Sequence, residues 1–199
     1  MPRATSSAVR APVSKKPKRL CVISTEDSKF GAYKYLQELK DHYNEKFVVQ
    51  ISEIIPSSDG KTTPKHVFNR LRKYGYDPSY DTYWVVSDVD RWGQQKLEDV
   101  TVECSKLRGF RAAISNNCFE IWLLYHHQGF NRTFNSSAEC KDAGEKYLER
   151  IGGYESLFEE NRINIAIEKA KEMDQPDEGW PKQQGSHLYK LLEYLRSET

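Results

Sequence analysis

The sequence predicts an α/β fold, in which a parallel sheet of about four strands is flanked by helices and followed by a helical C-terminal extension. Up to residue 115, short apolar runs alternate with segments of helical periodicity, and beyond it the periodicity is helical only. Parallel strands need crossover connections, so this alternation favours a sheet with helices on both faces.

Four short runs rich in branched and aromatic residues predict the strands. They are RLCVIS (19–24), FVVQISEII (47–55), TYWVVS (82–87) and FRAAIS (110–115). The segments between them place apolar residues on one helical face, and the loop PSSDGKTTP (56–64) precedes the second helix. These faces are Tyr35, Leu36 and Leu39; Val67, Phe68 and Leu71; and Leu97, Val100, Cys104 and Leu107.

The C-terminal half is predicted to be helical. CFEIWLLYHH (118–127) is apolar on nearly every side, which is typical of a central buried helix. Two later stripes have helical spacing: Ile163, Ala166, Ile167 and Ala170, then Leu188, Leu191, Leu192 and Leu195. We therefore expect a single domain over 19–199, with an α/β core (19–115) and a helical extension (116–199) packed on it.

Positive charge is concentrated at the N-terminus. Of the 30 Lys and Arg residues, six lie within residues 1–20, which contain no acid, so the rest has 24 against 29 Asp and Glu. Residues 1–18 are also poor in apolar residues, and this composition predicts a disordered basic tail. Such a tail fits two roles, contact with nucleic-acid phosphates or solubilisation.

Several classes of protein are disfavoured. No apolar run approaches the roughly 18 residues that span a bilayer, and the N-terminus is charged where a signal peptide is apolar, so we expect a cytoplasmic protein. The four cysteines have no CxxC spacing, which predicts buried thiols rather than a zinc site or disulfides. Neither a Walker-type phosphate loop nor a G-x-S-x-G elbow is present, so ATP hydrolysis is not expected.

Carboxylates follow two of the predicted strands. Asp88 and Asp90 come directly after the third strand, and Glu26 and Asp27 after the first. The carboxyl ends of parallel strands meet at one edge of the sheet, and ligands of such sheets bind there. Hard oxygen ligands of this kind suit Mg²⁺, which often takes only one or two protein carboxylates.

Each acidic position also fits a structural role. Asp90 precedes the predicted helix of residues 92–107 and fits its N-cap. Glu26 or Asp27 fits the positive end of the helix that begins near residue 30.

Three motifs resemble the RloB family of bacterial defence loci, which has the Toprim fold of topoisomerases and primases. TEDSKFGAYKYL (25–36) is similar to the family's TEGxKTExxYF, WVVSDVDRW (84–92) to WVVFDxDxH, and SNNCFEIWLLYHH (115–127) to SNPCFELWLLLHF. A weaker likeness is GSHLYKLLEYL (185–195), so the resemblance covers roughly residues 19–195.

The chain departs from the family pattern at three places. Lys29-Phe30-Gly31 replaces Lys-Thr-Glu in the first motif, which makes Glu26 the better match and Asp27 the alternative. Arg91, Trp92 and Gly93 stand where a histidine or acid often follows the DxD, and Asn117 replaces a proline.

The resemblance implies a divalent-metal-dependent nuclease that cleaves phosphodiester bonds in RNA, transfer RNA or DNA. Its ion would be Mg²⁺ or Mn²⁺. The implied metal ligands are Glu26, Asp88 and Asp90, which together with Glu120 and His126 make up the expected catalytic set. Lys29, Arg91 and Asn116 are the candidate substrate-binding residues, and Lys29 and Arg91 also fit solvated surface charges.

Two of these positions have competing interpretations. Glu120 lies three residues after Asn117 and fits a capping box as well as a place in the acidic cluster. The motif selects His126, whereas helical spacing puts His127 on the face of Glu120. Either position also fits a buried histidine that has no catalytic role.

The family also implies partners. It typically occurs beside an AAA-type ATPase called RloA, which would license cleavage in an anti-phage response. The expected partners are thus a nucleic-acid substrate, this ATPase and, because Toprim nucleases commonly dimerise, a second copy of the chain. The alternative is a non-catalytic Toprim-like module that binds nucleic acid or its partner; nucleotidyl transfer, as in primases, shares the metal chemistry.

Overall fold

The structure is a computed structural model that describes residues 19–47, 49–74, 81–89, 92–175 and 179–197. The predicted basic tail, 1–18, lies outside the described residues. So do two of the candidate site residues, Asp90 and Arg91.

A five-stranded sheet forms the centre of the fold. Its strands are β1 (Arg19–Thr25), β2 (Val49–Ile55), β3 (Asp81–Asp88), β4 (Phe110–Asn116) and β5 (Gly185–Ser186). Their order is β2-β1-β3-β4-β5; the pairs among the first four strands are parallel, and β5 is antiparallel to β4. This is the Toprim-like arrangement that the resemblance implied, with one strand more.

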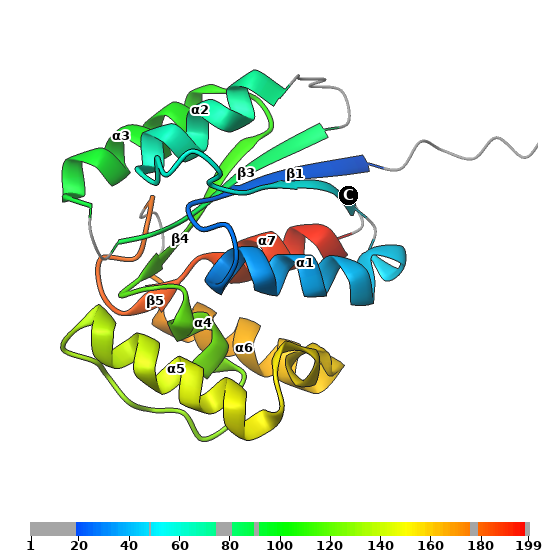
Figure 1. Ribbon diagram of the computed structural model, residues 1–199, viewed down its shortest axis with the longest axis vertical. Coiled ribbons are helices and arrows are strands. Elements are labelled where there is room, and N and C mark those ends of the chain that lie inside the picture. Colours follow the sequence, from blue (N-terminus) through cyan, green and yellow to red (C-terminus); the bar gives the residue numbers. More distant parts are fainter. Residues whose placement is uncertain (1–18, 48, 75–80, 90–91, 176–178, 198–199) are drawn as a thin grey trace, which may run out of the picture.

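Helices cover both faces of the sheet. They are α1 (Gly31–Tyr43), α2 (Pro64–Tyr74), α3 (Gln94–Lys106), α4 (Glu120–Tyr125), α5 (Ser137–Ile151), α6 (Glu160–Met173) and α7 (Leu188–Arg196), with short 3-10 turns η1 (Asn44–Lys46) and η2 (Tyr154–Phe158). Figure 1 shows α2 and α3 on one face, α1 and α7 on the other, and α4, α5 and α6 as a further layer beyond α1 and α7. None of the helices in the described ranges has both the length and the apolar composition needed to cross a bilayer.

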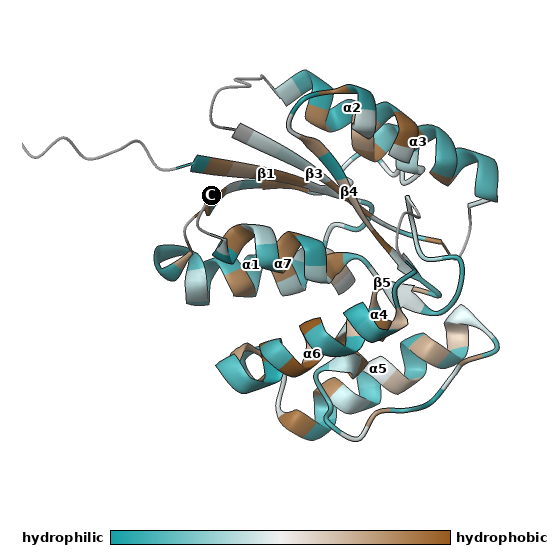
Figure 2. Cartoon of the chain, turned by 180° about the vertical axis from the view of Figure 1, so that it is seen from behind, coloured by the Kyte–Doolittle hydropathy of each residue, from teal (hydrophilic) through white to brown (hydrophobic). Residues whose placement is uncertain are grey.

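The core is divided by the sheet. Tyr83 and Val85 of β3 belong to the cluster under α2 and α3, whereas Trp84 and Val86 belong to the larger cluster with α1, α4 and α7. Successive residues of a strand point to opposite faces, so a strand covered on both sides is apolar throughout. Figure 2 shows this as hydrophobic strands between helices whose hydrophobic residues gather on the sides towards the sheet.

Two predicted helices are shorter than expected. The segment 118–127 is helical only over Glu120–Tyr125; residues 121–126 are buried as predicted, whereas His127 is exposed. The helix after β3 ends at Lys106, and Leu107 is 38% exposed instead of on the buried face. The cause is a tight turn into β4, in which Gly109 has a φ of 85° and the N–H of Phe110 donates to the carbonyl of Leu107.

The C-terminal segment takes part in the sheet itself. In β5, the hydroxyls of Ser186 and Ser115 are 2.9 Å apart, and the N–H of His187 donates to the carbonyl of Ile114. After β5, α7 returns across the face that α1 covers, where its leucines join the larger core cluster. The sequence did not predict β5, because two small residues carry no alternation of apolar and polar side chains.

Candidate acidic active site

Glu26 links the ends of two neighbouring strands. It follows β1, and its Oε2 atom accepts hydrogen bonds from the Ser87 hydroxyl (2.6 Å) and the Asp88 N–H (3.1 Å) at the end of β3. The Trp92 indole N–H also donates to this atom over 3.4 Å. The two strand ends therefore meet as the sequence predicted.

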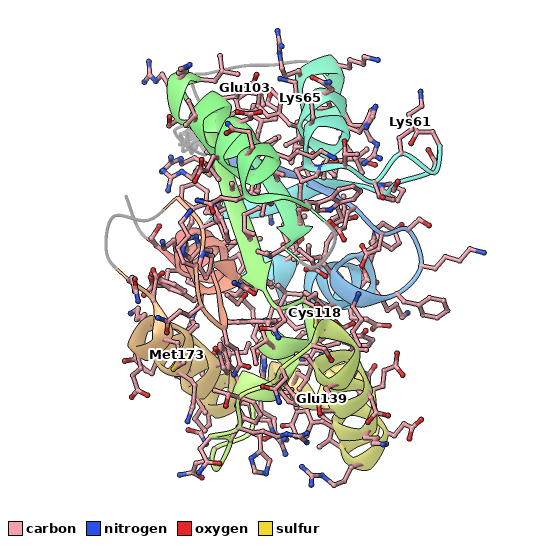
Figure 3. All side chains as sticks on the ribbon, turned by 90° about the vertical axis from the view of Figure 1, so that its left-hand side faces the viewer. Lys61, Lys65, Glu103, Cys118, Glu139 and Met173 are labelled. Carbon is pink, nitrogen blue, oxygen red and sulfur yellow. The ribbon has the colours of Figure 1, made fainter. Side chains whose placement is uncertain are left out.

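Asp88 lies at the end of β3 next to Ser115 of β4, and it is only 8% exposed. It shares a cavity of about 500 Å³ with Glu26 and with the loops that follow β1 and β2. Figure 3 faces this edge of the sheet; it labels Lys61 on the loop after β2 and Cys118, two residues before Glu120 in the chain. The cavity is lined by Glu26, Asp27, Ser28, Lys29, Phe30, Gly31, Ser57, Gly60, Thr62, Asp88, Phe119, Glu120 and Lys141.

Asp27 supports the start of α1. Its Oδ1 atom accepts a hydrogen bond from the N–H of Tyr33 over 3.0 Å. Burial raises the pKa of Asp27 to about 7, and the charge of Glu26 adds to this shift, while the hydrogen bond from Tyr33 opposes it. The two acids after β1 therefore have different surroundings: Asp27 accepts a hydrogen bond from the first turn of α1, whose N-cap residue is Phe30, and Glu26 reaches the end of β3.

Glu120 reaches the cavity from the first turn of α4. Its Oε2 atom is buried and has no hydrogen-bond partner among the described residues. No bond joins it to the N–H of Asn117, so the capping box is absent from this part of the chain. The structure thus places Glu120 with the acidic residues, which was one of its two interpretations.

Gly144 of α5 allows Glu120 to lie in this position. A Cβ atom at Gly144 would stand 2.5 Å from the Cβ of Glu120 and 2.9 Å from its Cγ. These distances are too short for two carbon atoms, so a side chain at Gly144 would push α4 away from α5.

We expect Gly144→Ala to destabilise the fold by about 1–3 kcal/mol, although alanine favours helices more than glycine does. Urea unfolding measures this, with Gly152→Ala as a control for glycine loss at a site whose φ of 84° is strained but where nothing lies within 4 Å. Unchanged stability in Gly144→Ala would contradict the close contact.

Two lysines border the acidic cavity. Lys29 is exposed at its rim, which fits both interpretations of this residue, and Lys141 enters from α5. Sequence reasoning missed Lys141, because α5 follows the long loop 128–136 and no motif includes it. A cation at this place suits an anionic ligand such as a phosphate.

The loop after β2 is held over the cavity by Arg70 of α2. One guanidinium nitrogen donates to the carbonyl of Thr25 (3.1 Å), and another donates to the Ser57 hydroxyl (2.9 Å) and to the carbonyl of Lys61. These bonds tie α2 to the ends of β1 and β2, so one wall of the cavity is fixed before any ligand arrives.

The structure does not bring the other candidates to the cavity. His126 is buried among the rings of Tyr35 and Trp122, and its Nδ1 atom lies 2.9 Å from the carbonyl of Trp122. The side-chain amide of Asn116 donates to the carbonyl of Pro181 over 3.0 Å and so ties β4 to the C-terminal segment. His127 lines two other cavities, neither of which includes Glu26, Asp88 or Glu120.

Asp90 and Arg91 lie outside the described residues, so their places in the site stay predictions. The alternative role of Asp90 as the cap of the next helix is wrong, because the N-cap residue of α3 is Gly93.

The cysteines are all free and buried, as predicted. Burial raises the pKa of Cys21 and of Cys104 to about 12. Near the cavity, a hydrogen bond with Cys140, together with burial, raises the pKa of the Cys118 thiol. Thiolates are therefore disfavoured at these three positions, and none of the three suits a nucleophile.

The acidic cavity offers few protein ligands to a divalent ion. Among the described residues, no group of three or more His, Cys, Asp or Glu side chains is placed to hold a metal ion. Mg²⁺ nevertheless often takes one or two carboxylates and fills its other positions with water and phosphate. Glu26 and Asp88 at adjoining strand ends, and the buried, unpartnered oxygen of Glu120, are chemically suited to this.

The fold and the cavity define an α/β protein with an acidic site at the carboxyl edge of its sheet. A family model described as RloB-like protein matches residues 21–195, so the chain belongs to the RloB-like family. Comparisons with curated proteins and with solved structures gave no match.

Proposed function

We propose that the chain is a divalent-metal-dependent nuclease that hydrolyses phosphodiester bonds in nucleic acid. The observation that supports it is the meeting of Glu26, Asp88 and Glu120, from three different elements, in one cavity with Lys29 and Lys141. Three buried or half-buried carboxylates repel one another, and a cation relieves this repulsion. The lysines suit the phosphate that such an ion would share.

Each residue then has a distinct role. Glu26 and Asp88 would hold Mg²⁺ or Mn²⁺, with Asp90 as a further candidate ligand. When bound, the ion supplies Lewis-acid stabilisation of the phosphate and lowers the pKa of a water. Glu120 would accept the proton of the attacking water, whose oxygen bonds to phosphorus as the bond to the leaving oxygen breaks, and the leaving oxygen would take a proton from solvent water. Lys29 and Lys141 hold the non-bridging phosphate oxygens.

The biological setting is part of the proposal and is supported by the family alone. The nuclease would act in the bacterial cytoplasm during an anti-phage response, under the control of an RloA-like AAA-type ATPase. A homodimer is the proposed assembly of the chain.

A second candidate is a non-catalytic module that binds nucleic acid or the ATPase. The observation that favours this module is that Glu26 already accepts three hydrogen bonds at Oε2. Such bonding suits a structural residue that links the ends of β1 and β3. The two candidates differ in their need for a metal ion: cleavage should stop without it, whereas binding should persist.

The test is cleavage of labelled RNA, transfer RNA and DNA by the purified chain, with Mg²⁺, Mn²⁺ or EDTA and with or without the ATPase. We expect products that vanish in EDTA, return with added Mg²⁺ and are missing from an identically purified Asp88→Asn preparation. Products that persist in EDTA would overturn the metal mechanism. Intact substrates in every reaction, including those with ATPase and an extract of phage-infected cells, would favour the binding module.

A further inference from the structure

A second cavity, of about 370 Å³, lies between α5 and the loop that joins α4 to α5. Figure 1 shows this loop running along α5 on the side away from the sheet. The lining differs from that of the acidic cavity, since it combines aromatic and basic side chains and includes no acid among the described residues. Its members are Leu124, His127, Gly129, Phe130, Asn131, Arg132, Phe134, Ala143, Lys146, Tyr147 and Arg150.

Aromatic rings form the apolar part of the cavity. Phe130 and Phe134 of the loop are stacked, with ring centroids 6.1 Å apart and planes 20° from parallel. Tyr147 of α5 meets the ring of the exposed His127 edge-on at 5.7 Å. Phe134 and Tyr147 are buried, so the half-buried Phe130 and the exposed His127 are the rings that can offer stacking partners to unpaired bases.

Two guanidinium groups lie over these rings. Arg132 stands 4.7 Å from the ring centre of Phe134, and Arg150 stands 5.4 Å from that of Tyr147. Arg150 has no ion pair among the described residues, and the pair between Arg132 and Glu139 is long, at 3.8 Å. Both cations are exposed, so their charge is available to phosphate groups and their planes to bases.

The loop that carries these residues is held in place. Gln184, from the segment before β5, accepts a hydrogen bond from the N–H of Phe134 (2.9 Å) and donates to the carbonyl of Arg132 (2.8 Å). Asn117 donates to the carbonyl of Phe134 over 3.2 Å. A wall fixed in this way lowers the entropy cost of binding.

The cavity adjoins a second hollow, of about 430 Å³, which shares His127, Tyr147 and Arg150 and adds Glu159 and Arg162, themselves an ion pair at 3.3 Å. The basic and aromatic surface therefore extends from Arg132 to Arg150. Two adjoining hollows with shared walls suit a strand rather than a free nucleotide.

We propose that this surface binds single-stranded nucleic acid. Bases would stack on Phe130 and on the guanidinium planes, and phosphates would contact Arg132 and Arg150. The site is separate from the acidic cavity, since Lys141 and Ala143, which line the two cavities, are 200° apart around α5 at 100° per residue. The inference goes beyond the proposed nuclease and does not need cleavage to occur.

The test measures binding in EDTA, so that no metal-dependent cleavage interferes. The two fluorescein-labelled probes are an oligouridylate of about 12 nucleotides and a blunt RNA duplex of similar length. Fluorescence anisotropy measures the binding of each probe. The variants are Arg132→Glu and Arg150→Glu. The matched control is Arg72→Glu, because Arg72 is also exposed and lies over a ring, that of Phe68, but on the opposite face of the sheet.

We expect each variant in the cavity to weaken binding of the single strand by roughly tenfold relative to Arg72→Glu. It should also reduce the salt dependence of binding by about one ion per lost phosphate contact, which a merely structural effect would not do. Equal binding by all three variants, or equal binding of strand and duplex, would overturn the proposal. Binding in EDTA does not depend on cleavage, and cleavage is measured separately with Mg²⁺, so failure of the nuclease and failure of this surface are distinguishable.

Discussion

Replacing Asp88 by asparagine is expected to lower the rate of cleavage by roughly 10³-fold, which corresponds to about 4 kcal/mol of transition-state stabilisation. Asparagine keeps the shape of the side chain but loses the negative charge that would hold the ion. Asp88 is 8% exposed and its N–H donates to Glu26, so its carboxyl group lies within the group of acids that would hold the ion. Single-turnover cleavage at saturating substrate measures the effect.

The control for this experiment is Asp99→Asn on α3. Asp99 accepts a hydrogen bond from Gln95 on the helix surface, away from the acidic cavity, so its loss should leave the rate unchanged. Thermal unfolding of both variants shows whether the fold is intact. Cleavage by a folded Asp88→Asn chain at the rate of the control would remove Asp88 from the mechanism.

A second large effect is expected at His126, in the dependence of stability on pH. Burial lowers the pKa of His126 to about 4, and the charge of Arg162 adds to this, while the hydrogen bond to the carbonyl of Trp122 opposes it. In the unfolded chain the imidazole has its ordinary pKa of about 6.5. Between these values the unfolded chain binds the extra proton, so stability falls as the pH falls from about 6.5 to 4.

The size of this contribution is about 3 kcal/mol, since each pKa unit corresponds to about 1.4 kcal/mol. His126→Phe keeps the aromatic contacts with Tyr35 and Trp122 and removes the titrating group. Urea unfolding between about pH 7 and pH 4 should therefore show a smaller loss of stability in the variant. Asp27, whose pKa is raised to about 7, acts in the opposite sense in both proteins and cancels in the difference.

The control is His127→Phe, at an exposed neighbour, which should keep the acid-induced loss of the unmodified chain. If His126→Phe and the unmodified chain lose stability in parallel, the histidine is not buried as a neutral group. A catalytic base at His126 predicts something different, a loss of activity in the variant near neutral pH without a change in its acid unfolding.

Regular periodicity made most of the fold predictable. The strands at 19–24 and 82–87 are apolar on both faces because helices cover both sides of the sheet. The strand β5 was missed because its two residues are set by the partner β4 and not by their own pattern. The early end of α3 was missed because it depends on the backbone conformation of Gly109.

The candidate site was predictable in part. Glu26 and Asp88 could be placed together because both follow strands of a parallel sheet, whose carboxyl ends meet at one edge. The choice between Glu26 and Asp27 depended on which carboxylate reaches Ser87. Glu120 could not be assigned from spacing alone, because a capping box and an inward position use the same three-residue interval. Lys141 was not predictable, since its approach depends on how α5 packs across Gly144.

The helix α7 covers a face of the sheet whose strands β1 to β4 all precede residue 117. During synthesis on the ribosome these strands emerge well before α7 does, so Trp84 and Val86 have an incomplete cover until residues 188–196 have been released. A sheet built in this order gains its fifth strand only after residues 185–186 have been made. Premature termination before residue 185 would thus leave a chain that lacks both β5 and α7 and exposes apolar surface for quality-control proteases to recognise.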